Sequence, residues 1–285
     1  MKIMNFLKTI LPVIALGSLM STASVAGITS FDGQGGNQKQ STTANATPQQ
    51  PLASADEAIA SASELRMLTQ RMYKDYIFAG LNVRARRARQ DLKQAMALFE
   101  TELARITLFA HNDNLKTRAT ELKDAWLSIK PIYSKSPDKG RVAELRDLNI
   151  ALLKASHTNV TTLMVFGGSR FGRMVNLAGE QTMLSQRMAA LYGLMAWGFE
   201  KEFEDIYNIV EKDFGYNLEV MMDHPINTSR VDRKLKKVKR QFASFGRSSK
   251  NGSRTYVPAL IDRSAEKMLE EMLDVTNLYA DLSSN

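Results

Sequence analysis

Residues 62–72 read ASELRMLTQRM, and residues 178–188 read AGEQTMLSQRM. The two stretches lie 116 residues apart, and seven of their eleven positions are identical. Aromatic residues recur at the same spacing, since Tyr76 is matched by Tyr192 and Trp126 by Phe242. Recurrence at a fixed spacing indicates a duplicated structural unit. The sequence therefore predicts two similar halves, residues 53–167 and 168–285.

The apolar pattern is helical from Ser54 almost to the end of the chain. In the first motif helix, Leu65, Leu68, Met72 and Tyr76 follow the spacing of a bundle core. No alternation of apolar and polar residues is long enough to predict a sheet. We expect helices at residues 55–81, 84–109, 115–133, 141–165, 171–197, 200–222, 229–245 and 258–282. The predicted fold class is all-α, with two tandem antiparallel four-helix bundle units.

Both motif helices also carry apolar or small residues on the side away from this core face. These residues include Met67 and Phe78 in the first helix, and Gly179 and Met183 in the second. A helix that is apolar on two sides is buried on two sides. We expect one side to face the helix's own bundle and the other to face the sister repeat or another subunit.

The N-terminus has the features of a secretory signal peptide. Lys2 and Lys8 accompany the apolar run Ile10–Met20, and small residues at 24–26 suit a signal peptidase. We expect residues 1–26 to be removed; an uncleaved anchor is the alternative, but a bilayer span needs about 20 apolar residues. Residues 27–52 are rich in Gly, Ser, Thr, Asn and Gln, which predicts a flexible linker. The expected location is the periplasm.

Composition restricts the chemistry. The chain of 285 residues has a net charge of +8, which suits anionic ligands or surfaces, although nucleic acid is a poor candidate partner in that compartment. It contains no cysteine, which excludes disulfides, thiol nucleophiles and thiolate metal sites. His111, His157 and His224 are isolated and form no Glu-x-x-His pair. Nucleotide-binding and metalloprotease motifs are also missing. We therefore expect no enzyme activity, no metal and no cofactor.

Two arginines of the motif suggest either of two roles. Arg71 and Arg187 flank the expected helix–helix interface, and each follows a glutamine, Gln70 or Gln186. A buried guanidinium needs an acidic or hydrogen-bonding partner. In one interpretation, carboxylates or carbonyls satisfy both arginines, which then set the helix register. In the other, the arginines converge on a small anion, which a planar fork of donors binds well.

The second copy of the motif, residues 178–188, resembles the signature of the PilJ-type domain. This is the N-terminal domain of type IV pilus methyl-accepting chemotaxis transducers. The first copy, at residues 63–67, resembles the version in NarX-type nitrate/nitrite sensors, with a small residue and then Leu, Arg and Met. The resemblance implies two extracytoplasmic four-helix bundles in tandem. In the nitrate sensors, arginines from two paired helices hold one anion, which places the anion-contacting residue at Arg66. The second copy has Thr182 there, so one chain lacks a symmetric pair.

The resulting hypothesis is a periplasmic sensory module that binds a small anion, such as nitrate or nitrite, between the motif helices and signals to a membrane-bound partner. The expected ligand-binding residues are Arg66, Gln70, Arg71, Gln186 and Arg187. The alternative is a non-catalytic scaffold or accessory protein of an envelope, type IV pilus or chemotaxis complex with no small ligand. In that case the basic helix at residues 229–245 would contact the partner, although such a run is also typical of a solvated face. A homodimer is an open alternative for the assembly.

Overall fold

The computed structural model describes residues 51–167, 172–249 and 256–284, which all belong to one compact unit. The predicted signal peptide and nearly all of the predicted linker lie outside the described residues. At the end of that linker, Leu52 is already buried in the core. Within the described ranges, no helix has both the length and the apolar character needed to cross a bilayer.

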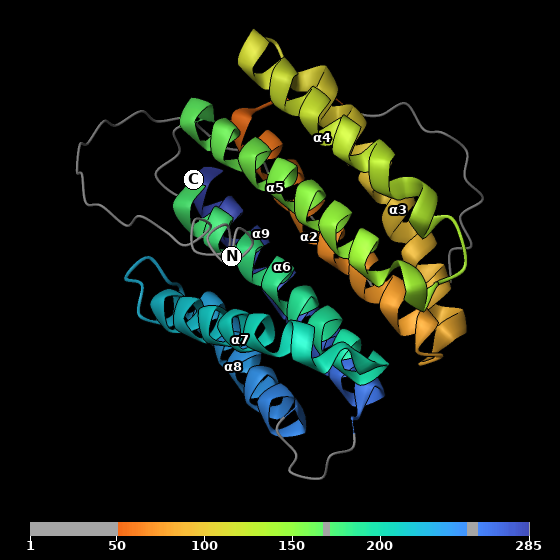
Figure 1. Ribbon diagram of the computed structural model, residues 1–285. Coiled ribbons are helices and arrows are strands. Elements are labelled where there is room, and N and C mark those ends of the chain that lie inside the picture. The colour runs from red at the N-terminus through yellow and green to blue at the C-terminus, as the bar shows by residue number, and fades with distance from the viewer. Residues whose placement is uncertain (1–50, 168–171, 250–255, 285) are drawn as a thin grey trace, which may run out of the picture. The chain divides into compact units, whose positions relative to one another are not determined.

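The described residues contain helices and no strands, which confirms the predicted all-α class (Figure 1). The α-helices are α2 (Ala55–Gly80), α3 (Ala85–Phe109), α4 (Asp113–Tyr133), α5 (Val142–Gly167), α6 (Gly172–Leu194), α7 (Glu200–Met222), α8 (Ser229–Ser249) and α9 (Pro258–Ser284). A short 3₁₀ turn, η1 (Lys139–Arg141), precedes α5, and a π-helical turn, η2 (Met195–Phe199), joins α6 to α7.

Local sequence explains where several helices begin and end. The Ser54 hydroxyl accepts from the Glu57 backbone N–H at 3.1 Å, so α2 has the predicted N-cap. The Asn112 side chain caps α4 by accepting from the Leu115 N–H at 3.0 Å, and α4 therefore begins two residues before its predicted start at 115. At its C-terminal end, α8 continues to Ser249 instead of ending at the predicted residue 245.

The helices pack as two groups of four, as the fold-class prediction requires. In the first group α2 contacts α3 and α5, and α4 contacts the same two helices. The second group repeats this arrangement, with α6 and α8 each contacting α7 and α9. Short connections join successive helices within each group, so neighbours in sequence run antiparallel.

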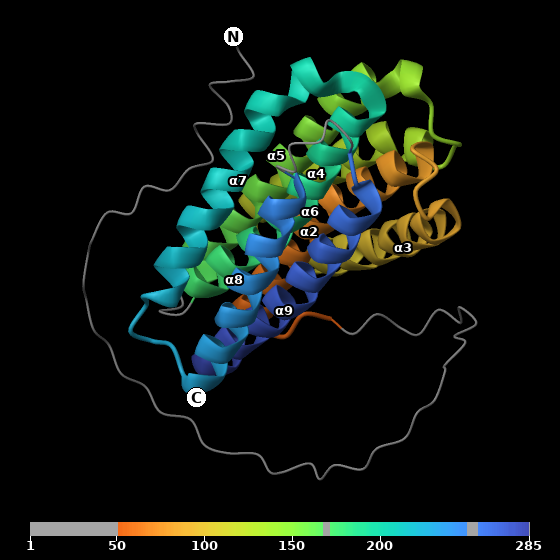
Figure 2. The ribbon, with the colours of Figure 1, turned by 90° about the horizontal axis from the view of Figure 1, so that it is seen from below.

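Helices α2 and α6 carry the two copies of the motif and pack side by side, as both ribbon views show (Figures 1 and 2). A Cβ added at Gly179 would lie 3.0 Å from Ser63, and one at Gly193 would lie 2.9 Å from Ile77. Each of these pairs is 116 residues apart, so the two helices run parallel and in register. We call this α2–α6 contact the seam. It confirms that the motif helices are buried on two sides, with the sister half on the second side.

Equivalent tyrosines anchor both halves at the same place. The Tyr76 hydroxyl accepts from the backbone N–H of Asp138 at 3.0 Å, ahead of α5. The Tyr192 hydroxyl accepts from the N–H of Val257 at 2.9 Å, ahead of α9. The two tyrosines are 116 residues apart and their backbone donors are 119 apart, and each of these hydrogen bonds fixes the segment ahead of the last helix of its group.

The second motif helix ends differently from the first. The sequence predicts an unbroken helix to Trp197, whereas the π-turn η2 follows Leu194 and Gly198 has φ 101°. Glycine tolerates this left-handed conformation without a Cβ clash. The turn places the Trp197 ring directly against Gly80, where any Cβ would come within 2.3 Å of it. A close aromatic contact thus closes this end of the seam.

Candidate functional site

The guanidinium of Arg66 is fully buried at the seam, with 0% of the residue exposed. It extends from α2 to α6, where its Nη2 donates to the backbone carbonyl of Asn176 at 3.0 Å. Its Nη1 lies 3.4 Å from Nδ1 of His157 on α5. Arg66 therefore contacts helices of both groups at once.

Arg66 forms no ion pair with any carboxylate among the described residues. Burial lowers the pKa of Arg66, and the negative charge of Glu180 only partly opposes this effect. Burial also raises the pKa of Glu180, which weakens it as a counter-ion. Buried arginines normally have a paired carboxylate, because the desolvation of a lone charge is costly. Arg66 is thus a buried cation whose charge is poorly compensated.

His157 is set up to accept a hydrogen bond from this cation. Burial, together with the nearby charge of Arg66, lowers the pKa of His157 to about 4. The imidazole is therefore neutral at pH 7 and offers Nδ1 as an acceptor to the guanidinium, a tautomer that we assign from this contact. A negative charge beside Arg66 would raise the pKa of His157 again.

Three buried polar atoms of Arg66 and of residues next to it have no hydrogen-bond partner among the described residues. They are Nε of Arg66, Oγ of Ser63 and Oδ1 of Asn176. Ser63 is only 3% exposed and lies against Gly179 across the seam. Buried polar atoms are nearly always paired in folded proteins. A small anion could accept from both the guanidinium and the serine hydroxyl, so the arrangement fits such a ligand chemically.

The equivalent position in α6 supports structure without supplying charge. The Thr182 hydroxyl donates to the Gly179 carbonyl at 2.6 Å, inside its own helix. The following turn matches the first copy closely, because Ser185 donates to the Thr182 carbonyl at 2.7 Å and Thr69 donates to the Arg66 carbonyl at 2.8 Å. The two copies share their backbone arrangement, and only the first has a cation at this position.

Arg71 belongs to a separate network of charges between α2 and α9. Its Nη2 donates to Glu266 at 3.4 Å, and its Nε lies 3.9 Å from Asp75. Beside it, Lys74 is 1% exposed and contacts Glu266, Asp262 at 3.2 Å and Asp75 at 3.3 Å. Carboxylates therefore pair with the charge of Arg71, although its Nε has no hydrogen-bond partner among the described residues, and this pairing fits the structural interpretation of the residue.

Arg187 lies on another side of the seam, near α2 and α7. Burial lowers its pKa, and the nearby Tyr73 and Asp213 oppose the shift. Neither Arg187 Nε nor the Tyr73 hydroxyl has a hydrogen-bond partner among the described residues. Arg187 thus has a polar environment of its own, distinct from that of Arg66.

The two glutamines point into their own helix groups. Gln70 donates to Asn149 on α5 at 2.9 Å, and Gln186 donates to the Ala265 carbonyl on α9 at 3.4 Å. Residues 149 and 265 are themselves 116 apart, so both glutamines play the same packing role in the two groups. The structure does not bring the five predicted ligand residues together: Arg66 stands alone at its site, and each of the other four has different neighbours.

Sequence reasoning missed the partners of Arg66. The sequence pattern shows His157 only as an isolated histidine, and it marks neither Asn176 nor the buried Lys74. Asn176 contributes its backbone carbonyl, which every residue has, so no side-chain signal could identify it. Ser63 lies within the motif, three residues before Arg66 on the same helix face, and this spacing is a usable signal.

The basic run on α8 is partly neutralised by its neighbours. Lys234 and Lys237 form ion pairs with Glu271 on α9, at 2.9 and 3.1 Å, and Lys239 pairs with Glu219 on α7 at 2.9 Å. Other basic residues of the run are exposed and form no ion pair within the described part of the chain; these are Arg230, Arg233, Lys236 and Arg240.

Residues 51–136 match the family model described as type IV pili methyl-accepting chemotaxis transducer N-term (PilJ). This match supports a PilJ-type domain in the part of the chain that spans α2 to α4 and contains Arg66. The family consists of signalling domains rather than catalytic ones, so the match relates the chain to sensory transduction. Comparison with curated proteins and with solved structures found no match.

Proposed function

We propose that the protein is an extracytoplasmic sensory module that binds a small planar anion, of the nitrate or nitrite type, at Arg66. The carrying observation is the fully buried guanidinium of Arg66, which has no paired carboxylate among the described residues. Its unpartnered Nε and the nearby Ser63 hydroxyl are donors that such an anion accepts from. The PilJ match over residues 51–136 supports the sensory role.

The position of Arg66 also suggests how binding is transmitted. The site involves α2, α5 and α6, which belong to both helix groups. An anion that neutralises Arg66 would strengthen contacts across the seam, and its binding energy would favour one arrangement of α2 against α6. A membrane-bound or envelope partner that contacts both groups could read this difference. We propose such a partner, a periplasmic location after removal of residues 1–26, and an origin of the two halves by duplication.

Isothermal titration calorimetry and thermal-shift measurements with nitrate, nitrite, formate and acetate, at constant ionic strength, test the anion site. We expect binding by the wild type and its loss in Arg66→Thr, which installs the residue that the second copy carries at this position. Arg86→Ala, which removes an exposed arginine of α3, is the control for non-specific charge and should bind normally. Absence of binding for every anion, or equal binding by Arg66→Thr, would refute the proposal.

A second candidate function is a scaffold that contacts an acidic envelope partner through α8. The supporting observation is the exposed set Arg230, Arg233, Lys236 and Arg240, which forms no ion pair within the described residues. Reversing the charge of Arg233, Lys236 and Arg240 should abolish capture of a cross-linked envelope partner. Reversal of the ion-paired Lys237 and Lys239 is the matched control. Unchanged capture after the first reversal would exclude this face as the contact.

A further inference from the structure

The two sides of the seam occupy equivalent places in the two helix groups. Helices α5 and α9 follow the same 116-residue spacing as α2 and α6, as the buried Leu145 and Ile261 show. On one side, Arg71 of α2 meets Glu266 of α9 at 3.4 Å. The counterpart of this contact lies on the other side, where Arg187 of α6 approaches α5. The two sides can therefore be compared position by position.

The carboxylates that neutralise the first side are replaced on the second. Around Arg71 and Lys74, these carboxylates belong to Asp75, Asp262 and Glu266. The residues at the corresponding positions of the second side are Leu191, Arg146 and Ile150. Lys74 itself is replaced by Ala190. The second side thus keeps the guanidinium of Arg187 but has an apolar side chain where Arg71 finds its carboxylate.

The guanidinium of Arg187 forms no ion pair and no hydrogen bond with the described part of the chain. The nearby Arg146 is paired with Asp147 at 2.9 Å and with Glu202 of α7 at 3.7 Å, so these two carboxylates already have a cation. The Tyr73 hydroxyl is buried near Arg187 and also has no hydrogen-bond partner among the described residues. The second side therefore offers a guanidinium and a phenol as donors without an acceptor.

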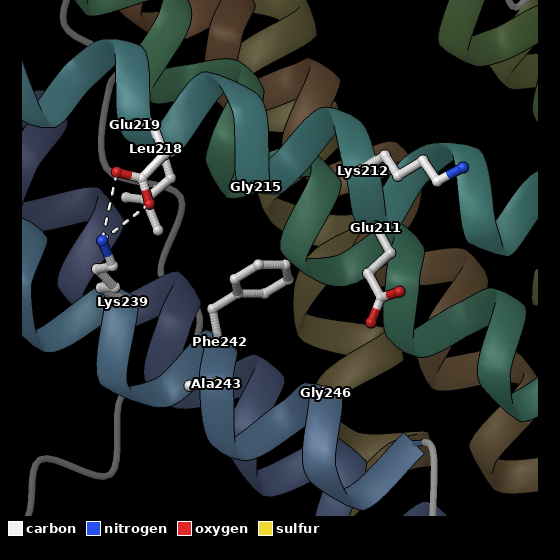
Figure 3. Close-up of a pocket in the computed structure, with 9 residues that line it drawn as sticks. All are labelled: Glu211, Lys212, Gly215, Leu218, Glu219, Lys239, Phe242, Ala243 and Gly246. Atoms are coloured by element: carbon white, nitrogen blue, oxygen red, sulfur yellow. Dashed lines mark hydrogen bonds and ion pairs between the residues drawn. The ribbon is translucent and has the colours of Figure 1, made fainter.

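Helix α7 contributes the carboxylate of Asp213 to the same place. One side of α7 packs against α8, where Gly215 lies above the Phe242 ring (Figure 3). At about 100° per residue, Asp213 is about 200° away from Gly215 and therefore points away from α8. Glu202, about three turns earlier on the same side of α7 as Asp213, pairs with Arg146 of α5. The side of α7 that carries Asp213 therefore faces α5 and the seam.

Arg187 and Asp213 have opposite charges and influence each other without forming an ion pair. Burial raises the pKa of Asp213, and the positive charge of Arg187 opposes this shift. Burial lowers the pKa of Arg187, and the negative charge of Asp213 is among the effects that oppose it. Both residues are half-buried, so a ligand can reach them from the solvent. Two opposite charges that face each other unpaired suit a ligand that carries both charges itself.

We propose that Arg187, Tyr73 and Asp213 bind a small apolar amino acid in its zwitterionic form. The carboxylate of the ligand accepts hydrogen bonds from the Arg187 guanidinium and the Tyr73 hydroxyl, and its ammonium donates to Asp213. Ile150 supplies apolar surface for the side chain of the ligand. The bound amino acid thus provides Arg187 with the carboxylate that Glu266 provides to Arg71 on the first side of the seam.

Isothermal titration calorimetry with L-alanine and L-valine tests this site. The matched probes are propionate and isovalerate, which lack the ammonium group, and ethylamine and isobutylamine, which lack the carboxylate. We expect each amino acid to bind at least about tenfold more tightly than either of its fragments, because each fragment loses a charge-assisted hydrogen bond at one end.

Three variants assign the two ends of the ligand. Arg187→Gln should weaken binding of L-alanine about tenfold or more. Asp213→Asn should lower the affinity for L-alanine to about that for propionate, and it should leave propionate binding no weaker, because only the ammonium needs this carboxylate. Ile150→Glu supplies an internal carboxylate to Arg187 and should abolish binding while circular dichroism shows that the helical content is retained.

Two further variants are controls. Arg71→Gln changes the equivalent arginine on the other side of the seam and should leave binding of L-alanine unchanged. Arg66→Thr should also leave it unchanged, which separates this site from the anion site, so either proposal can fail without the other. Equal binding of L-alanine and propionate, unaffected binding in Arg187→Gln, or no binding of either amino acid at about 10 mM by folded protein would overturn the proposal.

Discussion

Replacement of Arg66 by methionine should stabilise the protein when no anion is present. Methionine is unbranched and apolar, and it can occupy the volume of the arginine stem within the seam. The substitution removes a fully buried guanidinium that forms no ion pair among the described residues. Buried charges replaced by well-packed apolar groups often leave a protein equally or more stable.

Two opposing contributions set the magnitude. Desolvation of the cation costs several kcal/mol, approximately, after relaxation. The hydrogen bond to the Asn176 carbonyl at 3.0 Å recovers about 1.5–3 kcal/mol, because one partner is charged. Glu180 would lose its favourable neighbour, which reduces the gain. The expected net effect is a stabilisation of about 1–2 kcal/mol. In a domain of this size, each kcal/mol raises Tm by about 2–4 °C.

Urea unfolding followed by circular dichroism, in a buffer without small oxyanions, measures this effect. Arg71→Met is the matched comparison, because carboxylates pair with that arginine and its removal should cost about 1 kcal/mol. The two substitutions should therefore shift stability in opposite directions. A loss of more than about 1 kcal/mol in Arg66→Met would show that Arg66 is a structural residue, and the anion-site argument would fail.

Three further predictions concern the surroundings of Arg66, the buried Lys74 and two of the helical glycines. In an NMR titration, Arg66→Met should raise the pKa of His157 from about 4 towards its ordinary value, because a nearby positive charge is lost; an unchanged pKa would show that Arg66 has no electrostatic effect there. Lys74→Met should destabilise the protein by about 3–5 kcal/mol at pH 7.5, because buried carboxylates lose their cation. The pKa of Asp75 is already raised to about 6 and should rise further without Lys74. The loss of stability in Lys74→Met should therefore be smaller at pH 5, where Asp75 is protonated, than at pH 7.5. A loss of stability that does not depend on pH in urea unfolding would contradict this reasoning. Gly193→Ala should destabilise the protein by about 1–3 kcal/mol through the clash at 2.9 Å, whereas Gly246→Ala should stabilise it by about 0.5–1 kcal/mol. Equal changes of stability in thermal melts would rule out this distinction between the two glycines.

Most of the fold follows from local features of the chain. Each helix is specified by a 3.6-residue apolar period, and caps such as Ser54 are read within a few residues. The buried sides of α2 and α6 also follow from their own sequences, because apolar residues occupy two faces of each helix. The end of α6 was less predictable, since the π-turn at Met195–Phe199 depends on how Trp197 packs against Gly80.

Some features of the candidate site also follow from the sequence alone, and others depend on the tertiary structure. The sequence by itself determined that the repeated motif has Arg66 in its first occurrence and Thr182 at the same place in its second, because this difference lies within the motif. Tertiary structure alone decided that Arg66 meets Asn176 and His157, that Arg71 is paired with Glu266, and that Gln70 and Gln186 point into separate groups. The physical reason is that a helical period specifies which residues are buried, whereas the rotation and register of packed helices decide which buried side chains meet. The parallel register of α2 and α6 follows from their packing. It places Arg66 against α6, where no carboxylate among the described residues forms an ion pair with it.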